Sequence, residues 1–429
     1  MKFSNYNIFV NLFNENYIYN SFTGALIKIN TLVCNKLKDD SNSFNKFSDD
    51  ELVFLKNNGI IIEENMNELK LIEEKMDFIL KRKEILTLTI APTLDCNFNC
   101  YYCFEKHEKG KMSQETANSL FDFIVSEIKS GIKIIKIIWY GGEPLLEIDF
   151  ITNFMEQLFL ICKKYNVSCF SGMITNGFLL NEINCRKLKN LNLSTLQVTL
   201  DGEPEVHNKR RTLKNSPLGT FDTILENLRI AKQVGLNISI RINIDMENII
   251  SNENLLKILY QNGLNDFKID LGYVENFNFL NCSSIVEKDN FYTYKLEFNK
   301  LLSKYNFKTL ELFPKQNAIF CGAYNSKSFV INWDGNIFKC WSDIGNKNYS
   351  LGNINMVNPA LLENKRYDFN DIFKSECLEC NILPICAGGC PHLFLKEGNR
   401  KCSIYKYKLK EILERKILNF KEEKNGNNY

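Results

Sequence analysis

Residues 96–104 have the sequence Cys96-Asn97-Phe98-Asn99-Cys100-Tyr101-Tyr102-Cys103-Phe104, so three cysteines stand in the spacing C-x3-C-x2-C. A [4Fe–4S] cube takes four ligands, and three local thiolates therefore leave one iron open to a small molecule. An open coordination position is typical of a reactive metal site, whereas a closed one is structural. Zinc is the alternative, but it prefers four protein ligands, and the stretch holds neither a histidine nor a fourth cysteine. The stretch therefore predicts a catalytic iron–sulfur cluster.

The composition limits the class of protein. A length of 429 residues suggests two or three domains. The net charge of +2, without long runs of one sign, gives no reason to expect a nucleic-acid or membrane partner. The first ten residues are too polar for a secretory signal, and the most apolar stretch, 132–139, is too short for a spanning helix. We therefore expect a cytoplasmic protein, in which clustered cysteines bind metal rather than form disulfides.

Residues 1–80 are predicted to form a unit of their own. Short strands are expected at 6–13, 17–20 and 24–29, then helices at 31–37 and 48–58 and a returning strand at 59–62. This order predicts a small winged helix-turn-helix-like module. DNA binding is the usual function of such a fold, but 8 Lys/Arg against 12 Asp/Glu argue against it. The alternatives are capture of a peptide as an extra strand on an exposed sheet edge and a purely structural lid.

From Leu86 onward, strands and helices alternate. Strands are expected at 86–90, 132–139, 167–174, 195–200, 236–244 and 267–274, and helices at 113–128, 221–234, 254–262 and 290–305. Repeated βα units predict a parallel sheet with right-handed crossovers. The fold class is therefore α/β, with a partial (β/α)6 TIM-like barrel.

Unusual residues follow the carboxyl ends of four of these strands. They are the cysteine stretch, Gly141-Gly142-Glu143-Pro144, Thr175-Asn176-Gly177 and Asp201-Gly202. In a barrel these ends meet at one rim, where active sites are built. Each motif also has a simpler interpretation, since glycine and proline make turns and Thr or Asp cap helices.

The cysteine stretch, followed by Phe104, resembles the cluster loop of the radical S-adenosylmethionine enzymes. The resemblance implies that Cys96, Cys100 and Cys103 hold the catalytic cluster, whose open iron binds the amino and carboxylate groups of S-adenosylmethionine. The Gly-Gly-Glu-Pro segment resembles the family's Gly-Gly-Glu motif. The family's Asp-Gly…His…Arg segment is similar to Asp201-Gly202, His207 and Arg210-Arg211. By spacing, Arg211 matches the arginine whose guanidinium can bind the methionine carboxylate through two N–H groups. The residues that this resemblance implies for cofactor binding are Tyr102, Gly141, Gly142, Glu143, Pro144, Thr175, Asn176, Thr199, Asp201, Arg211 and Arg241.

The last quarter of the chain is rich in cysteine, spaced C-x13-G-x4-C and then C-x2-C-x5-C-x3-C-x11-C. Zinc ribbons would explain this composition, but the order and spacing resemble the SPASM extension of radical S-adenosylmethionine enzymes, which holds two auxiliary [4Fe–4S] clusters. Mapped by position, one cluster is closed by Cys377, Cys380, Cys386 and Cys402. The other, inner cluster receives three ligands, Cys321, Cys340 and Cys390, which implies an open iron. The remaining cysteines are interpreted as buried small hydrophobic residues: Cys34, Cys162, Cys169, Cys185 and Cys282.

The resemblance divides the chain into a leader-peptide recognition module (1–80), a radical SAM partial barrel (81–275), a connector (276–310) and a SPASM domain with a C-terminal helix (311–429). It implies three [4Fe–4S] clusters, S-adenosylmethionine and an electron donor such as flavodoxin or ferredoxin. The implied chemistry is reductive cleavage of S-adenosylmethionine to a radical that removes hydrogen from an unactivated carbon. The implied substrate is a ribosomally synthesised precursor peptide.

The expected reaction is thioether formation at a peptide cysteine, because an open auxiliary iron has room for a substrate thiolate. Maturases of the sactipeptide and ranthipeptide type carry out this reaction. Carbon–carbon cross-linking and epimerisation are alternatives within the family. A third is the sulfatase-maturing dehydrogenase, which carries an aspartate directly after the cysteine matched by Cys340. Here that position is Trp341, with Asp343 nearby. A non-catalytic, metal-binding DNA regulator is the alternative from a different class.

Overall fold

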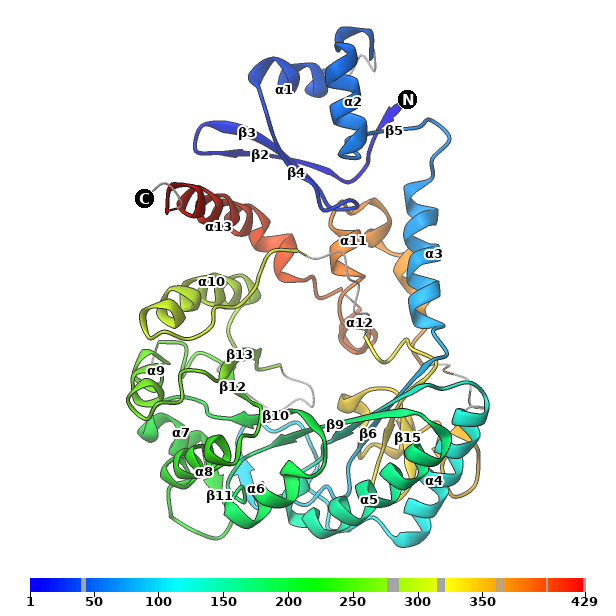
Figure 1. Cartoon of the computed structure of the whole chain (residues 1–429), viewed down its shortest axis with the longest axis vertical. Helices are drawn as coiled ribbons and strands as arrows, with labels where there is room; N and C mark the ends of the chain where they lie inside the picture. The colour runs from blue at the N-terminus through cyan, green and yellow to red at the C-terminus, as the bar shows by residue number, and fades with distance from the viewer. Residues whose placement is uncertain are drawn as a thin grey trace. The chain divides into compact units, whose positions relative to one another are not determined.

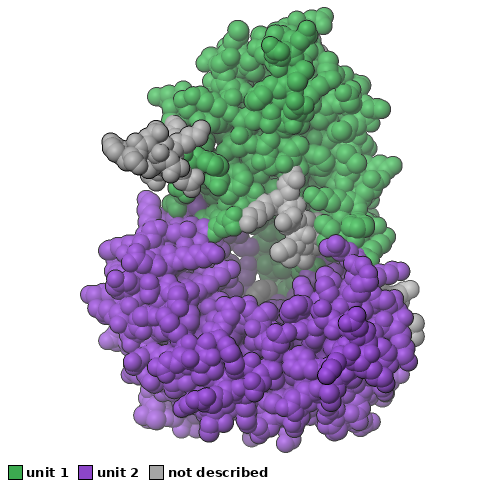
Figure 2. Space-filling view, viewed as in Figure 1, with its two compact units in different colours: residues 1–81, 311–321, 368–429 green, residues 82–310, 322–367 purple. Residues whose placement is uncertain are grey.

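The computed structural model describes residues 1–39, 44–250, 252–275, 285–314, 321–359, 362, 364, 366–398 and 400–426. Contacts divide the chain into two compact units, which Figure 2 colours separately. Unit 1 comprises Met1–Lys81, Glu311–Cys321 and Asp368–Tyr429, and unit 2 comprises Arg82–Leu310 and Gly322–Tyr367. The leading segment thus shares a unit with most of the cysteine-rich tail, while residues 322–367 belong with the barrel.

Unit 2 is built on one large sheet. Six parallel strands stand in the order β13 (Lys268–Tyr273), β12 (Ile238–Ile244), β10 (Leu193–Thr199), β9 (Ser168–Thr175), β8 (Ile134–Trp139) and β6 (Ile85–Ile90). The prediction of an α/β fold with a six-stranded partial barrel is confirmed. Three further strands, which the sequence did not predict, extend the sheet beyond β6: β14 (Ser328–Ile331), parallel to β6, and the antiparallel β15 (Asn336–Phe338) and β16 (Gly352–Asn353).

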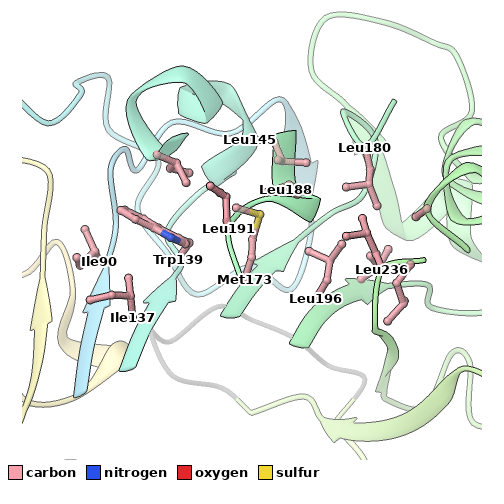
Figure 3. Close-up of a cluster of buried hydrophobic side chains, with 14 of the residues drawn as sticks. Ile90, Ile137, Trp139, Leu145, Met173, Leu180, Leu188, Leu191, Leu196 and Leu236 are labelled. Atoms are coloured by element: carbon pink, nitrogen blue, oxygen red, sulfur yellow. The ribbon is translucent and has the colours of Figure 1, made fainter. Parts of the chain in front are cut away.

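Helices cover the outer face of this sheet (Figure 1). They include α4 (Gln114–Lys129), α5 (Ile148–Tyr165), α6 (Glu182–Lys189) and α8 (Phe221–Val234). Along β8, alternate residues are buried, ending at the fully buried Trp139, whose ring packs edge-on against Phe154 of α5. Figure 3 shows part of this core, in which Ile90, Met173 and Leu196 from three other strands belong to the same cluster of buried hydrophobic side chains. The polar residues that follow the strands therefore lie outside this core, at the rim formed by the carboxyl ends of the strands.

The beginning of α4 shows why the sequence predicted this helix at nearly its observed position. Ser113 is its N-cap and accepts a hydrogen bond from the backbone N–H of Thr116, and Glu115 lies in the first turn. These are the features that favour a helix start, because the first turn has unpaired N–H groups and a positive dipole end. The sequence did not predict α5 or α6, nor α9 (Asn252–Gln261) at its observed start.

Unit 1 begins with a three-stranded antiparallel sheet, β2 (Asn7–Leu12), β3 (Glu15–Asn20) and β4 (Leu26–Ile29), in that order. Helices α1 (Thr31–Lys38) and α2 (Asp49–Asn57) follow, then β5 (Ile61–Ile62), which pairs with β1 (Lys2–Phe3), and α3 (Glu68–Leu80). Ser48 and Glu51 form a capping box at the start of α2. The winged helix-turn-helix-like module is therefore confirmed, with α3 as an unpredicted addition.

The module is not independent within unit 1. Leu12, Tyr17 and Tyr19 share a hydrophobic cluster with Ile382 and with Leu413 of the C-terminal helix α13 (Ile404–Gly426), which is kinked at Lys408. Removing residues 1–80 would expose this apolar surface to water. Among the described helices, none is long and apolar enough to cross a membrane.

Candidate functional site

The cysteine loop follows β6 and is fixed by a small sheet of its own. Residues Phe98–Cys100 form strand β7, which pairs antiparallel with β11 (Arg211–Leu213). In this register, Cys100 lies opposite Arg211. The pairing therefore brings the middle cysteine and the predicted carboxylate-binding arginine together, although they are far apart in the sequence.

The Gly-Gly-Glu segment holds the other side of the loop. The backbone N–H of Glu143 donates to Asp95 O (2.9 Å), and that of Gly142 donates to Thr93 O (3.3 Å). A Cβ on Gly142 would lie 2.5 Å from Leu94 O, closer than side chains approach backbone atoms. Gly141 has a φ of +113°, which favours glycine. The two glycines thus let β8 end directly against the backbone that leads into Cys96.

The Glu143 carboxylate is fully buried and ties the ends of β8 and β9 together. It accepts hydrogen bonds from Thr175 Oγ1 (2.7 Å) and from the backbone N–H groups of Asn176 (2.7 Å) and Leu145 (3.0 Å). Burial raises its pKa, and these donors oppose that shift. A carboxylate has about four acceptor positions, so one remains for the ammonium that the resemblance assigns to it.

Asn176 connects this group to the first cysteine. Its Nδ2 donates to Asn97 Oδ1 (2.7 Å) and lies 3.9 Å from Cys96 Sγ. Pro144 is buried at the start of the short 3-10 helix Pro144–Glu147, directly after Glu143. The predicted residues Glu143, Thr175 and Asn176 therefore form one connected group beside Cys96.

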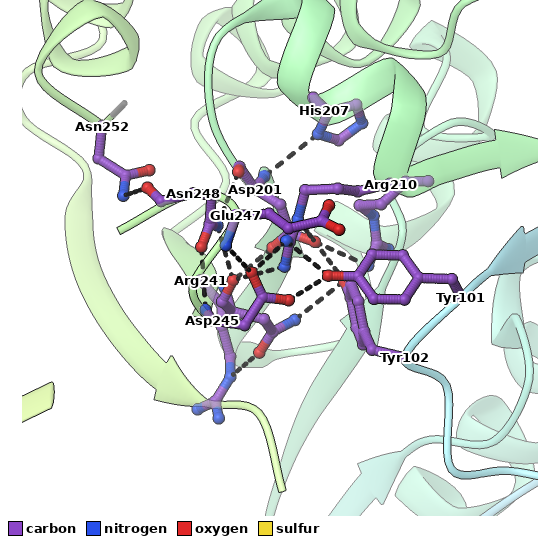
Figure 4. A network of polar contacts seen from close by, with 12 residues as sticks. Tyr101, Tyr102, Asp201, His207, Arg210, Arg241, Asp245, Glu247, Asn248 and Asn252 are labelled. Atoms are coloured by element: carbon purple, nitrogen blue, oxygen red, sulfur yellow. Dashed lines mark hydrogen bonds and ion pairs between the residues drawn. The ribbon is translucent and has the colours of Figure 1, made fainter. Parts of the chain in front are cut away.

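A second connected group surrounds Tyr102 (Figure 4). The Tyr102 hydroxyl donates to the fully buried Asp201 carboxylate and accepts from Arg211 and from Asn243 Nδ2 (3.2 Å). Asp201 also accepts from the backbone N–H of Asn243 (2.9 Å) and lies 3.8 Å from the Arg211 guanidinium. Three predicted residues are thus joined in one polar network next to the cysteine loop.

Sequence reasoning missed the other half of this network. Arg210 is buried and pairs with Asp245 (2.6 Å), and its guanidinium also donates to the Tyr101 hydroxyl (2.8 Å). Tyr101 in turn donates to Asp245. The sequence contains the doublets Tyr101-Tyr102 and Arg210-Arg211. Only the pairing of β7 with β11 shows that Tyr101 contacts Arg210 and that Tyr102 contacts Arg211.

His207 is fully buried on α7 (Pro204–Arg210), and its Nδ1 accepts from the backbone N–H of Asp201 (3.2 Å). Burial, with the nearby Arg211 and Arg210, holds its pKa well below the usual value. The imidazole is therefore neutral and shapes the Asp-Gly turn.

Two predicted residues lie on neighbouring strands. Arg241 donates to Asn243 Oδ1 (3.0 Å) and pairs with Asp270 (3.4 Å), while Thr199 lies beside Arg241 in the β10–β12 register. The Arg241 guanidinium lies against Gly272, where an added Cβ would displace it.

The three loop cysteines suit a metal cluster. Burial is the main cause that raises the pKa of Cys96 and Cys100, and it raises the pKa of Cys103 to about 12. Negative charge on each cysteine also disfavours ionisation of the others. Three thiolates at this position therefore need more positive charge than Arg211 supplies, and iron provides it.

Four cysteines of unit 1 line one small pocket: Cys377, Cys380, Cys386 and Cys402. We call it the four-cysteine pocket. Burial and the neighbouring cysteines together raise the pKa of Cys402, so this donor set also favours a cation. Of the other tail cysteines, Cys321 and Cys390 belong to unit 1 and Cys340 belongs to unit 2. Outside the motifs, Cys34, Cys162, Cys169 and Cys185 are buried as predicted, and Cys282 lies outside the described residues.

Comparison with known proteins identifies the family. Residues 90–258, which contain the cysteine loop, the Gly-Gly-Glu segment and the Asp201 network, match the model of the radical SAM superfamily. Residues 90–258 of this chain therefore form a radical SAM domain. This radical SAM protein is therefore an enzyme, and its family implies one [4Fe–4S] cluster and S-adenosylmethionine.

Relatives cover different shares of the chain. An uncharacterized protein of Methanocaldococcus jannaschii is 28% identical over 283 residues, which are 64% of this chain and 91% of that protein. The radical SAM cyclopropyl synthase TigE of Paramaledivibacter caminithermalis is 23% identical over 456 aligned residues, 93% of this chain and 92% of that enzyme. The radical SAM enzyme described here thus has a relative that matches nearly its whole length.

The fold also resembles a solved structure. The protein anSMEcpe with bound AdoMet is 19% identical, with a TM-score of 0.60 over 76% of this chain and 98% of that chain. The same protein has been solved with AdoMet and a peptide bound, at 18% identity, with a TM-score of 0.59 over 77% and 98%. At this identity, the likeness concerns the fold of the radical SAM enzyme.

Proposed function

We propose that this enzyme is a peptide maturase that cleaves S-adenosylmethionine reductively and removes hydrogen from a ribosomally synthesised precursor peptide, forming cysteine thioether cross-links. The observation that carries the proposal is the three-cysteine loop, tied to the Gly-Gly-Glu end of β8 and to Arg211 on β11. The cluster at Cys96, Cys100 and Cys103 would supply the electron for cleavage. A peptide substrate is supported by the likeness to anSMEcpe, which has been solved with a peptide bound.

In this proposal, the chain's own residues position the cofactor. Arg211 offers its guanidinium beside Cys100 for a carboxylate, and Glu143 offers its remaining acceptor position for an ammonium. Asp201 fixes Tyr102 and pairs with Arg211. Because these groups are buried and mutually hydrogen-bonded, they orient a ligand with little further reorganisation.

Two auxiliary clusters complete the proposal. Cys377, Cys380, Cys386 and Cys402 would close the outer one, and their common pocket supports this assignment. Cys321, Cys340 and Cys390 would supply three ligands to the inner one, leaving room for a substrate thiolate. Coordination would lower the thiol's pKa and hold its sulfur near the carbon to be joined. An electron donor such as flavodoxin or ferredoxin would reduce the enzyme.

The surroundings of Asp343 favour cross-linking over the dehydrogenase alternative. Its carboxylate is fully buried, accepts from the Tyr367 hydroxyl (2.6 Å) and pairs with Arg366 (3.3 Å). A carboxylate held in this way is a poor mobile base. The adjacent Trp341 packs on Tyr140, with ring centroids 4.9 Å apart.

Metal analysis tests the enzyme assignment. Anaerobically reconstituted full-length protein is expected to hold about twelve irons in three clusters. Replacing Cys96, Cys100 and Cys103 by Ala should remove about four and abolish formation of 5′-deoxyadenosine. Stoichiometric zinc in place of iron would contradict the proposal.

Mass spectrometry tests the bond. The probe is a synthetic cysteine-containing peptide offered as the precursor and analysed after turnover. We expect a loss of two hydrogens per modification, with the affected cysteine no longer alkylated by iodoacetamide. Two hydrogens lost with every thiol still free would indicate a carbon–carbon link instead.

Leader recognition by residues 1–80 is tested in the full chain, because the module shares its core with α13. The outer strands of its sheet, β2 and β4, are the edges available for an added strand. Hydrogen–deuterium exchange with the leader peptide should slow at 7–12 or 26–29, and a scrambled peptide should leave both unchanged. Slowing elsewhere only would refute the assignment.

A further inference from the structure

Two cations line the four-cysteine pocket. Lys406, on α13, places Nζ 3.7 Å from Cys380 Sγ, within reach of an N–H···S hydrogen bond. Arg400 lines the same pocket and is only 7% exposed. Positive charge therefore approaches the sulfurs from two segments.

Arg400 is held firmly in this position. Its guanidinium lies 3.8 Å from the centroid of the Phe394 ring, a cation–π contact, and donates to Gly388 O (3.4 Å). Lys406, by contrast, is exposed to solvent. The Arg400 charge is thus buried and fixed, while the Lys406 charge is screened by salt.

Charge near sulfur ligands sets the reduction potential of an iron–sulfur cluster, together with hydrogen bonds to the sulfurs and exposure to solvent. One-electron reduction adds a negative charge, which a fixed neighbouring cation stabilises. We infer that Arg400 and Lys406 raise the reduction potential of the outer auxiliary cluster and so make it an electron acceptor. This inference rests on the proposed function, which assigns a cluster to the four-cysteine pocket.

The test is a redox titration of the full-length holoenzyme with dithionite, followed by electron paramagnetic resonance. The signal of the outer cluster is identified by its loss when Cys377, Cys380, Cys386 and Cys402 are replaced by Ala. In Arg400→Gln we expect at least a tenfold fall in the equilibrium constant for reduction, which lowers a one-electron midpoint potential by about 59 mV. Arg400→Lys should restore most of this loss, because it keeps the charge.

Lys406→Met should give a smaller shift in the same direction, and it should diminish at high salt. The matched control is Lys401→Met. This lysine lies one residue from Arg400 but does not line the pocket, so its removal should shift the potential much less than Arg400→Gln does.

The outcomes separate this inference from the proposed function. If the cysteine replacements remove no iron, or remove zinc, the cluster assignment fails and the inference fails with it. If iron is present but Arg400→Gln leaves the potential unchanged, the inference alone is wrong. If Arg400→Gln does not fold or does not retain iron, Lys406→Met decides, since it changes an exposed residue: a lowered, salt-sensitive potential supports the inference and an unchanged one overturns it.

Discussion

Replacing Gly142 by Ala should separate the end of β8 from the cysteine loop. The added Cβ would meet three backbone atoms of Leu94 and Asp95, the two residues before Cys96. Backbone atoms cannot move aside as the end of a flexible side chain can. The strain must therefore displace the loop itself or the hydrogen bond from Glu143 N–H to Asp95 O.

The size of the effect follows from the distances. The Cβ would lie 2.5 Å from Leu94 O and still closer to Asp95 O, and ordinary contact begins at 3.4 Å, so the two segments must separate by at least about 0.9 Å. Overpacking of this kind costs about 1–3 kcal/mol of stability. A displacement of about 1 Å in positioned reacting groups costs about 10²-fold in rate. We expect Gly142→Ala to reduce cleavage of S-adenosylmethionine by about two orders of magnitude.

The assay compares 5′-deoxyadenosine formation, iron content and thermal unfolding with those of Gly172→Ala. Gly172 lies within β9, and a Cβ there would meet only Thr195 O, at 3.4 Å, among the described atoms. This control should keep full activity and change stability by less than about 1 kcal/mol. If Gly142→Ala cleaves S-adenosylmethionine as fast as Gly172→Ala does, the close approach of β8 to the loop is not what positions the cluster.

Three further predictions concern the buried network. The free energy of unfolding should fall as pH drops through about 6.5, by up to about 1.4 kcal/mol at pH 5.5, because the unfolded chain protonates His207 more readily than the folded chain does. Urea titrations of His207→Asn should lack this component, and an equal pH dependence would contradict it. Arg210→Met and Asp245→Asn should each cost about 3–5 kcal/mol, since each unbalances the charge of a buried ion-pair network in which Arg210 pairs with Asp245 and lies 3.9 Å from Asp201. The double variant should cost less than the sum of the two, and additive costs in denaturation would show that the pair is not coupled. Arg211→Lys should keep iron but weaken S-adenosylmethionine binding about tenfold in calorimetry, because lysine lacks the planar fork; unchanged affinity would remove Arg211 from the cofactor site.

Most of the barrel was predictable because its signals are local. Six apolar strand segments and the capped start of α4 are written in consecutive residues, and the structure places them within a few residues of the prediction. The motifs follow strand ends for the same reason. By contrast, β14 to β16 are two to four residues long and carry no periodic pattern, so only pairing with β6 makes them strands.

Local sequence was enough to predict the three-cysteine loop, the order of βα units and the spacing of the tail cysteines, since each depends on residues close together in the chain. The pairing of Arg210 with Tyr101 and of Arg211 with Tyr102 follows instead from the fold, because it depends on the register between β7 and β11, which lie more than a hundred residues apart. The fold likewise sets the contact by which Glu143 joins the ends of β8 and β9, and the grouping of residues 1–81 with most of the cysteine-rich tail. Such contacts depend on side chains that pack across long sequence separations, and no local pattern encodes them.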